Sequence, residues 1–151
     1  MRQVFRLQMP GVAHATQLYI TALTLFKNGE KERALKIFNH IVQDKFLIGV
    51  IWSIPEGVTF YSMMADCYLK KGMVGKAIWC FKELLKSKAV GTRDRLFYKG
   101  MIALFEKRKQ DALEYFEKAH QFDPEDKNIK YNLQRVRELL KQQNNVPQIK
   151  K

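Results

Sequence analysis

The sequence predicts an all-α fold of three helical hairpins followed by a C-terminal capping helix. Two observations predict it: an internal repeat in the middle of the chain, and a stripe of apolar residues at helical spacing near its end. The repeat consists of three windows of equal length that align without gaps. They are Tyr19–Phe38, Ser62–Phe81 and Phe97–Phe116. Because the windows share one pattern of small and apolar residues, each is expected to form the same helix–turn–helix unit.

Small and aromatic residues occupy the same columns in all three windows. Small side chains let two antiparallel helices approach closely where they cross, and a phenylalanine one turn after the second small residue lies on the same helix face. Gly29 and Gly72 provide the left-handed conformation that ends the first helix of a pair, whereas the third window has Lys107 at this place. The shared columns hold Ala22, Ala65 and Gly100, then Ala34, Ala77 and Ala112, and finally Phe38, Phe81 and Phe116.

The helices are expected in the order that the repeat dictates. The segment Asp44–Gly57 lengthens the spacing between the first two copies, so the second helix of the first hairpin is expected to run long and to turn at Pro55 and Gly57. A narrow apolar stripe from Ile129 to Leu140 predicts a helix that covers the last hairpin and shows water a polar side. The expected helices are 14–27, 31–52, 58–70, 74–88, 92–105, 109–121 and 127–143.

The windows resemble the tetratricopeptide repeat, whose hallmark is this order of small residue, alanine and phenylalanine across a helical hairpin. The third copy also ends in the manner of that family, with Ala119 followed by Phe122, Asp123 and Pro124. The resemblance covers about Ala15–Asn144 and implies a right-handed tetratricopeptide-like solenoid. The expected organisation is an N-terminal segment 1–13, a repeat domain 14–144 with repeats at about 15–57, 58–91 and 92–125 and a capping helix at about 127–143, and a flexible tail 145–151.

Composition and motifs narrow the class of function. The hydrophobic content of 46% argues against wholesale disorder, and the longest apolar stretch is too short for a membrane-spanning helix. Cys67 and Cys80 are expected to be reduced thiols of a cytoplasmic protein, because reducing compartments disfavour disulfides. Metal-binding, nucleotide-binding and hydrolase motifs are absent from the sequence. We therefore expect a protein that is not an enzyme and that holds no cofactor and no metal.

The resemblance to the tetratricopeptide repeat implies a binding groove. In such solenoids the first helix of each pair lines a concave face, which would hold a peptide or a segment of a partner protein. The protein is then a scaffold or adaptor. A clamp for the C-terminal carboxylates of chaperones is not expected, because the comparable face holds Tyr19, Leu23, Asp94 and Tyr98. The expected groove residues are Tyr19, Leu23, Lys27, Asp66, Lys70, Phe97, Met101 and Phe105.

The net charge of +12, from 27 Lys and Arg against 15 Asp and Glu, indicates the chemistry of the partner. A basic surface speeds encounter with an acidic protein, so an acidic partner is expected. The excess charge could also serve only to keep the surface solvated, or could bind an anionic membrane or nucleic acid, although a basic stripe with stacking aromatics is not found. The candidate docking cluster is Lys82, Lys86, Lys88, Arg93, Arg95 and Lys99.

Two further functions stay open. The segment Asp44–Gly57, called the apolar insert below, could be an extra turn packed in the core, or an exposed ridge through which the protein associates with a second copy. Its candidate contacts are Phe46, Ile51 and Trp52, with Trp52 as anchor. A small bacterial secretion chaperone is the other alternative, because some of those proteins hold three such repeats.

Overall fold

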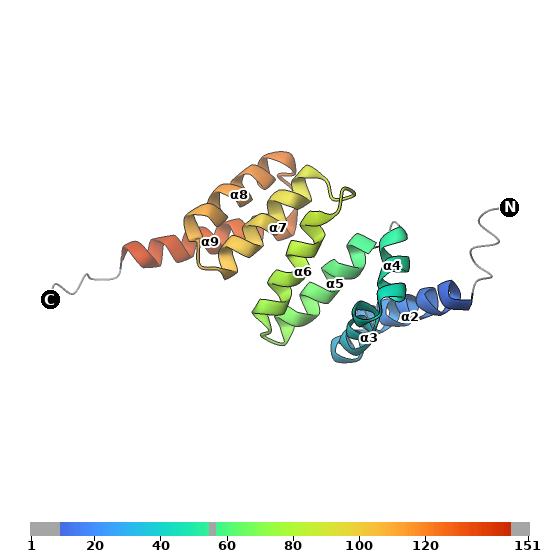
Figure 1. Ribbon diagram of the computed structural model, residues 1–151. Coiled ribbons are helices and arrows are strands. Elements are labelled where there is room, and N and C mark those ends of the chain that lie inside the picture. Colours follow the sequence, from blue (N-terminus) through green and yellow to red (C-terminus); the bar gives the residue numbers. More distant parts are fainter. Residues whose placement is uncertain (1–9, 55–56, 146–151) are drawn as a thin grey trace. The chain divides into compact units, whose positions relative to one another are not determined.

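The computed structural model describes residues 10–54 and 57–145 (Figure 1). Predictions about residues 1–9, Pro55 and the tail from 146 onward lie outside this part of the chain. Within the described ranges every regular element is an α-helix, which confirms the all-α fold. The helices are α2 (Pro10–Lys27), α3 (Lys31–Gln43), α4 (Lys45–Ser53), α5 (Gly57–Lys70), α6 (Val74–Lys86), α7 (Thr92–Phe105), α8 (Lys109–Phe122) and α9 (Lys127–Asn144).

The contacts divide the chain into two compact units, Met1–Leu84 and Leu85–Lys151. In the first unit α2 packs against α3 and α4, and α5 packs against α3 and α4. A ring contact between Tyr61 and Trp79 joins α5 to α6. In the second unit α8 packs against both α7 and α9. The expectation of one repeat domain over 14–144 stays a prediction.

The predicted repeat is confirmed in the packing of each hairpin. Ala34, Ala77 and Ala112 stand in the second helix of their hairpins and have no exposed surface. In the third hairpin, a Cβ added to Gly100 would lie 2.6 Å from Cε1 of Phe116. The small columns are therefore buried inside the hairpins, the helices of the third hairpin approach closely at Gly100, and the phenylalanine column fills the interior.

The turns between paired helices also repeat. In all three, the residue with positive φ donates its backbone N–H to a carbonyl three residues before it, and the next N–H donates to the carbonyl five residues before itself. This pair of bonds is the Schellman motif, which satisfies the last carbonyls of a helix. The positive φ values are 82° at Gly29, 71° at Gly72 and 62° at Lys107. The third turn thus adopts the glycine conformation without a glycine.

The expected long helix 31–52 is wrong, because it is two helices that meet at Asp44. The side chain of Asp44 accepts hydrogen bonds from the backbone N–H groups of Phe46 at 2.9 Å and Leu47 at 3.1 Å. This N-cap starts α4 in a new direction. The helix expected at 14–27 also begins earlier, at Pro10, since proline is well suited to the first position of a helix. Among the described helices none is by itself long and apolar enough to cross a membrane, and α4 with α5 reaches that length only across a bend of 119°.

The C-terminal helix α9 has the predicted capping pattern. Ile129, Leu133 and Val136 are buried, while Leu140 is half-buried near the end of the helix. Asp126 caps the helix by accepting a hydrogen bond from the backbone N–H of Ile129 at 2.9 Å. Its apolar stripe faces the last hairpin, because α9 packs against α8.

Candidate interaction surfaces

The groove residues predicted in the first unit differ in accessibility. Lys27 and Lys70 are exposed, and Leu23 is half-buried. Tyr19, by contrast, is buried, and its ring lies 6.3 Å from that of Phe60. Tyr19 therefore holds α2 against α5 and is left out of the binding surface that we consider below.

Asp66 does not stand free on α5. Its carboxylate pairs with the ammonium of Lys31 at 2.5 Å, and that ammonium also lies 5.0 Å from the centre of the Phe26 ring. Lys71, which directly follows α5, forms a second link to α3 by pairing with Glu32 at 3.4 Å. These pairs connect α5 to the start of α3, so part of the local charge is neutralised. Sequence reasoning did not assign a partner to Asp66, because Lys31 is distant from it in the chain.

The groove residues predicted in the second unit are mostly packed. Met101 is buried, so it too is left out of the binding surface. The ring of Phe97 is half-buried and lies 5.9 Å from that of Phe116 and 6.0 Å from that of Tyr98. Phe105 is half-buried. The apolar groove predicted on this unit is therefore largely a packing face.

Three of the predicted residues occupy equivalent places. Lys27, Lys70 and Phe105 stand in the same column of the repeat, and each is the last residue of the first helix of its hairpin. The first two are exposed ammonium groups, whereas the third is a half-buried ring. A basic surface at the ends of α2 and α5 is thus the part of the predicted groove that remains open to a partner.

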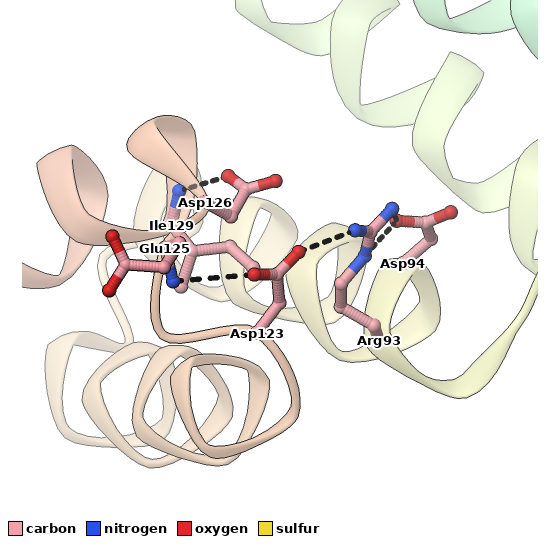
Figure 2. A network of polar contacts seen from close by, with 6 residues as sticks. All are labelled: Arg93, Asp94, Asp123, Glu125, Asp126 and Ile129. Carbon is pink, nitrogen blue, oxygen red and sulfur yellow. Dashed lines mark hydrogen bonds and ion pairs between the residues drawn. The ribbon is translucent and has the colours of Figure 1, made fainter.

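The predicted basic cluster contains two arginines with structural partners. Figure 2 shows Arg93 between Asp94 and Asp123. Its guanidinium donates to Asp94 at 3.0 Å and to Asp123 at 2.8 Å. Asp123 lies in the loop before α9 and also accepts from the backbone N–H of Glu125 at 3.3 Å. Arg93 therefore ties the start of α7 to the loop between α8 and α9, and its charge is already matched.

Arg95 is the second arginine of the cluster with a structural role. Its guanidinium donates to the backbone carbonyls of Val90 at 3.1 Å, Leu85 at 2.8 Å and Ser87 at 2.5 Å. These carbonyls belong to the end of α6 and the loop that follows it. The placing of Arg93 and Arg95 in a docking cluster is therefore corrected: both hold the chain together. Lys82, Lys86, Lys88 and Lys99 are exposed.

The apolar insert packs mainly against its neighbours, which removes one of the three residues predicted for self-association. Ile51 has no exposed surface and so cannot contact a second copy. Phe46 is 54% exposed, yet its ring lies over Gly11, where an added Cβ would meet Cε1 at 2.6 Å. Trp52 is half-buried and stacks on Tyr61, with the ring centres 4.7 Å apart. The insert folds back on the first hairpin and on α5 instead of forming a free ridge.

Trp79 is a surface residue that the sequence analysis did not single out. It is 40% exposed on α6, and its ring centre lies 5.8 Å from that of Tyr61. Burial raises the pKa of Tyr61 to about 12, so its hydroxyl is neutral at physiological pH. A signal was available in the sequence, because Trp79 follows the buried column of Ala77 at a spacing that turns it outward.

The two cysteines are free and buried. Burial raises the pKa of Cys67 to about 11 and that of Cys80 to about 12, so neither is a thiolate near neutral pH. A reactive thiol needs the opposite shift. Among the residues that the structure describes, no group of His, Cys, Asp and Glu is arranged to hold a metal ion.

An open hollow of about 500 Å³ lies between the turn before α8 and the end of α9. It is lined by the basic run Lys107–Lys109 and by polar residues of α9. Arg108 is paired with Asp111 at 2.9 Å and with Glu106 at 3.6 Å. The wall of the hollow is therefore polar and basic, with the charge of Arg108 matched by Asp111 and Glu106.

Comparison with known families matches two parts of the chain. A family model described as PPR repeat matches residues 59–88, which hold most of α5 and all of α6. A second, described as Tetratricopeptide repeat, matches residues 96–126, which hold most of α7 and all of α8. No curated protein has a sequence that matches this chain.

Solved structures of similar fold include three tetratricopeptide-repeat (TPR) domains. The first is the C-terminal TPR-containing domain of a Plasmodium falciparum protein described as FK506-binding, with a TM-score of 0.69 and 19% identity over 89% of this chain and 93% of that one. The first TPR domain of human RPAP3 has a TM-score of 0.62 and 13% identity over 88% and 97%. The Arabidopsis OM64 TPR domain has a TM-score of 0.60 and 15% identity over 85% and 98%. At these identities the likeness concerns the fold.

Proposed function

The chain is a helical-repeat protein of the tetratricopeptide type, and on this premise we propose that it is a non-catalytic scaffold that binds a segment of an acidic partner protein. The proposed site is the surface at the ends of the first helices of the first unit. We call it the first-helix surface, and it consists of Leu23, Lys27 and Lys70. As part of the same proposal the protein works in a reducing compartment such as the cytoplasm, where its two free thiols would persist.

The observation that carries this proposal is the repeated position of Lys27 and Lys70. Each ammonium is exposed at the end of its helix, and no carboxylate is paired with either in the described residues. Asp66, the acid nearest in the sequence to Lys70 on α5, is held by Lys31. Two unmatched cations on repeated elements suit a partner segment with spaced carboxylates. The net charge of +12 would speed its encounter with the chain.

The experiment measures binding of labelled acidic peptides by fluorescence anisotropy. The double variant Lys27→Glu/Lys70→Glu is compared with Lys36→Glu/Lys141→Glu, which changes the net charge equally at exposed sites on α3 and α9. We expect the first variant to bind at least about tenfold more weakly, as for loss of two charge-assisted contacts, and the second to bind nearly as the parent does. Equal loss in both variants would mean a general charge effect and would defeat the proposal.

A second candidate function is binding of single-stranded RNA. The PPR repeat match over residues 59–88 favours it, because PPR repeats read RNA bases with side chains of successive helical repeats. Retention on immobilised RNA should then fall steeply with salt and should depend on base sequence. Retention that depends on salt but not on sequence would reflect only the net charge of the chain.

A further inference from the structure

Both tryptophans of the chain pack against one tyrosine of the first unit, Tyr61. Trp52 on α4 stacks on Tyr61 of α5, with an angle of 21° between the rings. Trp79 on α6 contacts the same tyrosine at 5.8 Å and an angle of 51°. The surface made by Trp52 and Trp79 over Tyr61, with the flanking Lys76 and Lys82, is called the tryptophan face below. Three helices contribute to it, so its shape depends on the fold and not on one helix.

The tryptophan face has a firm base. Tyr61 is only 2% exposed, and its ring lies 5.3 Å from that of Phe60. Phe60 in turn contacts Phe38 edge to face at 5.0 Å. Trp52 is held on its other side by the start of α5, where a Cβ added to Gly57 would meet Cε3 of the indole at 3.2 Å. Aromatic rings fixed in this way lose little conformational entropy when a partner covers them.

The outer part of the face is open. Trp79 leaves 40% of its side chain exposed, and α6 has a glycine one turn before it. A Cβ added to Gly75 would meet no atom within 4 Å, so the helix surface beside the indole is clear. The indole itself lies more than 4 Å from that Cβ and packs toward Tyr61, so the space beside it is open. A half-exposed tryptophan with free space beside it is the arrangement expected of a binding anchor.

The charges around the face indicate the kind of partner. Lys76 and Lys82 are exposed one turn before and after Trp79 on α6. Glu83 is the carboxylate on this part of the helix, and it is half-buried with an interaction of its own. A second copy of the chain would itself carry a net charge of +12. Charge complementarity therefore favours an acidic partner over self-association.

We infer that the tryptophan face is a second binding surface, distinct from the first-helix surface, for an acidic protein segment that carries an apolar anchor residue. The anchor packs against the exposed part of Trp79 in the open space beside Gly75, and carboxylates on either side of it pair with Lys76 and Lys82. The stacked pair of Trp52 and Tyr61 forms the floor. Binding here stands on these contacts and does not depend on binding at Lys27 and Lys70.

The two indole N–H signals in a ¹H–¹⁵N NMR spectrum test the inference, because the chain has two tryptophans and both lie on this face. The probe is a short peptide with a Leu-Phe pair between Glu and Asp residues. One counterpart has Ser in place of Leu and Phe, and another has Lys in place of the acids. We expect the first peptide alone to move both indole signals. Trp79→Ala should weaken its binding by about tenfold or more, read from the remaining indole and by calorimetry.

Three variants act as comparisons. Lys82→Glu keeps both indoles and should also weaken binding of the peptide. Ile20→Ala removes another exposed apolar side chain of the same unit, 48% exposed on α2, and should bind as the parent does. Lys27→Glu/Lys70→Glu should leave the indole shifts in place, and loss of these shifts in that variant would overturn the claim of a separate surface. The inference itself would be overturned if the peptide left both indole signals unmoved, or if it moved them equally in Lys82→Glu and in the parent. It would also be overturned if the indole signals shifted with protein concentration in the absence of peptide.

Discussion

Replacement of Gly100 by alanine tests the close approach of α7 and α8. An added Cβ would lie 2.6, 2.8 and 2.9 Å from Cε1, Cδ1 and Cζ of Phe116. Carbon atoms in contact prefer about 3.5–4.0 Å, so either the ring or one of the helices must move. The ring has no room to swing out, because Phe116 is fully buried and lies against Phe97. The methyl group therefore has to be accommodated by strain in the third hairpin.

The magnitude follows from two opposing effects. Alanine is favoured over glycine inside a helix by about 0.5–1 kcal/mol, whereas overpacking of a full interior costs about 1–3 kcal/mol. We expect Gly100→Ala to lower the free energy of unfolding by about 1–2 kcal/mol, measured by urea denaturation followed by circular dichroism. Gly49→Ala on α4 is the matched control, since an added Cβ there meets nothing within 4 Å, and it should raise stability by about 0.5–1 kcal/mol. A stabilised Gly100→Ala variant would refute the packing argument.

Three other perturbations have outcomes set by single observations. Lys107→Gly should stabilise the protein by about 0.5–1 kcal/mol in the same denaturation assay, because φ at this residue is 62° and glycine removes the strain; a loss of stability would contradict it. Cys67 and Cys80 have pKa values raised from 9.0 to about 11 and about 12, so folding favours their neutral forms. Stability should therefore hold below pH 9 and then fall as pH rises, up to about pH 11 for Cys67 and about pH 12 for Cys80, and Cys→Ala variants should show a shallower fall. Arg95→Lys should cost about 1–3 kcal/mol, since an ammonium cannot reach three carbonyls as the guanidinium fork does, and it should leave peptide binding unchanged.

The repeat could be predicted from the sequence because its physical signals are local. Alanine and phenylalanine columns report helix crossings directly, and Gly29 and Gly72 mark turns that need a positive φ. Lys107 shows the limit of this reasoning, because the third turn forms without the residue that identifies it. The column alignment nevertheless locates it, since neighbouring windows fix where the turn must be.

The break at Asp44 was predictable in principle. Aspartate is a common N-cap residue, and Asp44 accepts hydrogen bonds from the first N–H groups of α4. The apolar run that follows it nevertheless has the spacing of a helix, and this favoured the prediction of one continuous helix. The same run also suggested Ile51 as a surface contact, because helical spacing does not say whether an apolar stripe faces solvent or a neighbouring helix. Ile51 is buried only because α4 folds back on the first hairpin and α5, a long-range contact that no local pattern reveals.

The predicted basic cluster illustrates a second limit. Charge counting treats each cation as available, yet Arg93 and Arg95 use their donors on Asp123 and on backbone carbonyls elsewhere along the chain. Asp66 is held by Lys31 in the same way. What sequence reasoning could give was the excess of positive charge. Tertiary contacts decide which cations remain free. Lys27 and Lys70 are among the cations that remain free.

Amide chemical shifts of the full chain, titrated with the acidic peptide that binds most tightly, test the proposed scaffold function most directly. The account predicts that the largest shifts occupy the ends of α2 and α5 around Lys27 and Lys70, and that they vanish in the charge-reversed variant of these two residues. Shifts of the same size with a basic peptide, or an acidic peptide that binds while leaving both helix ends unperturbed, would contradict it.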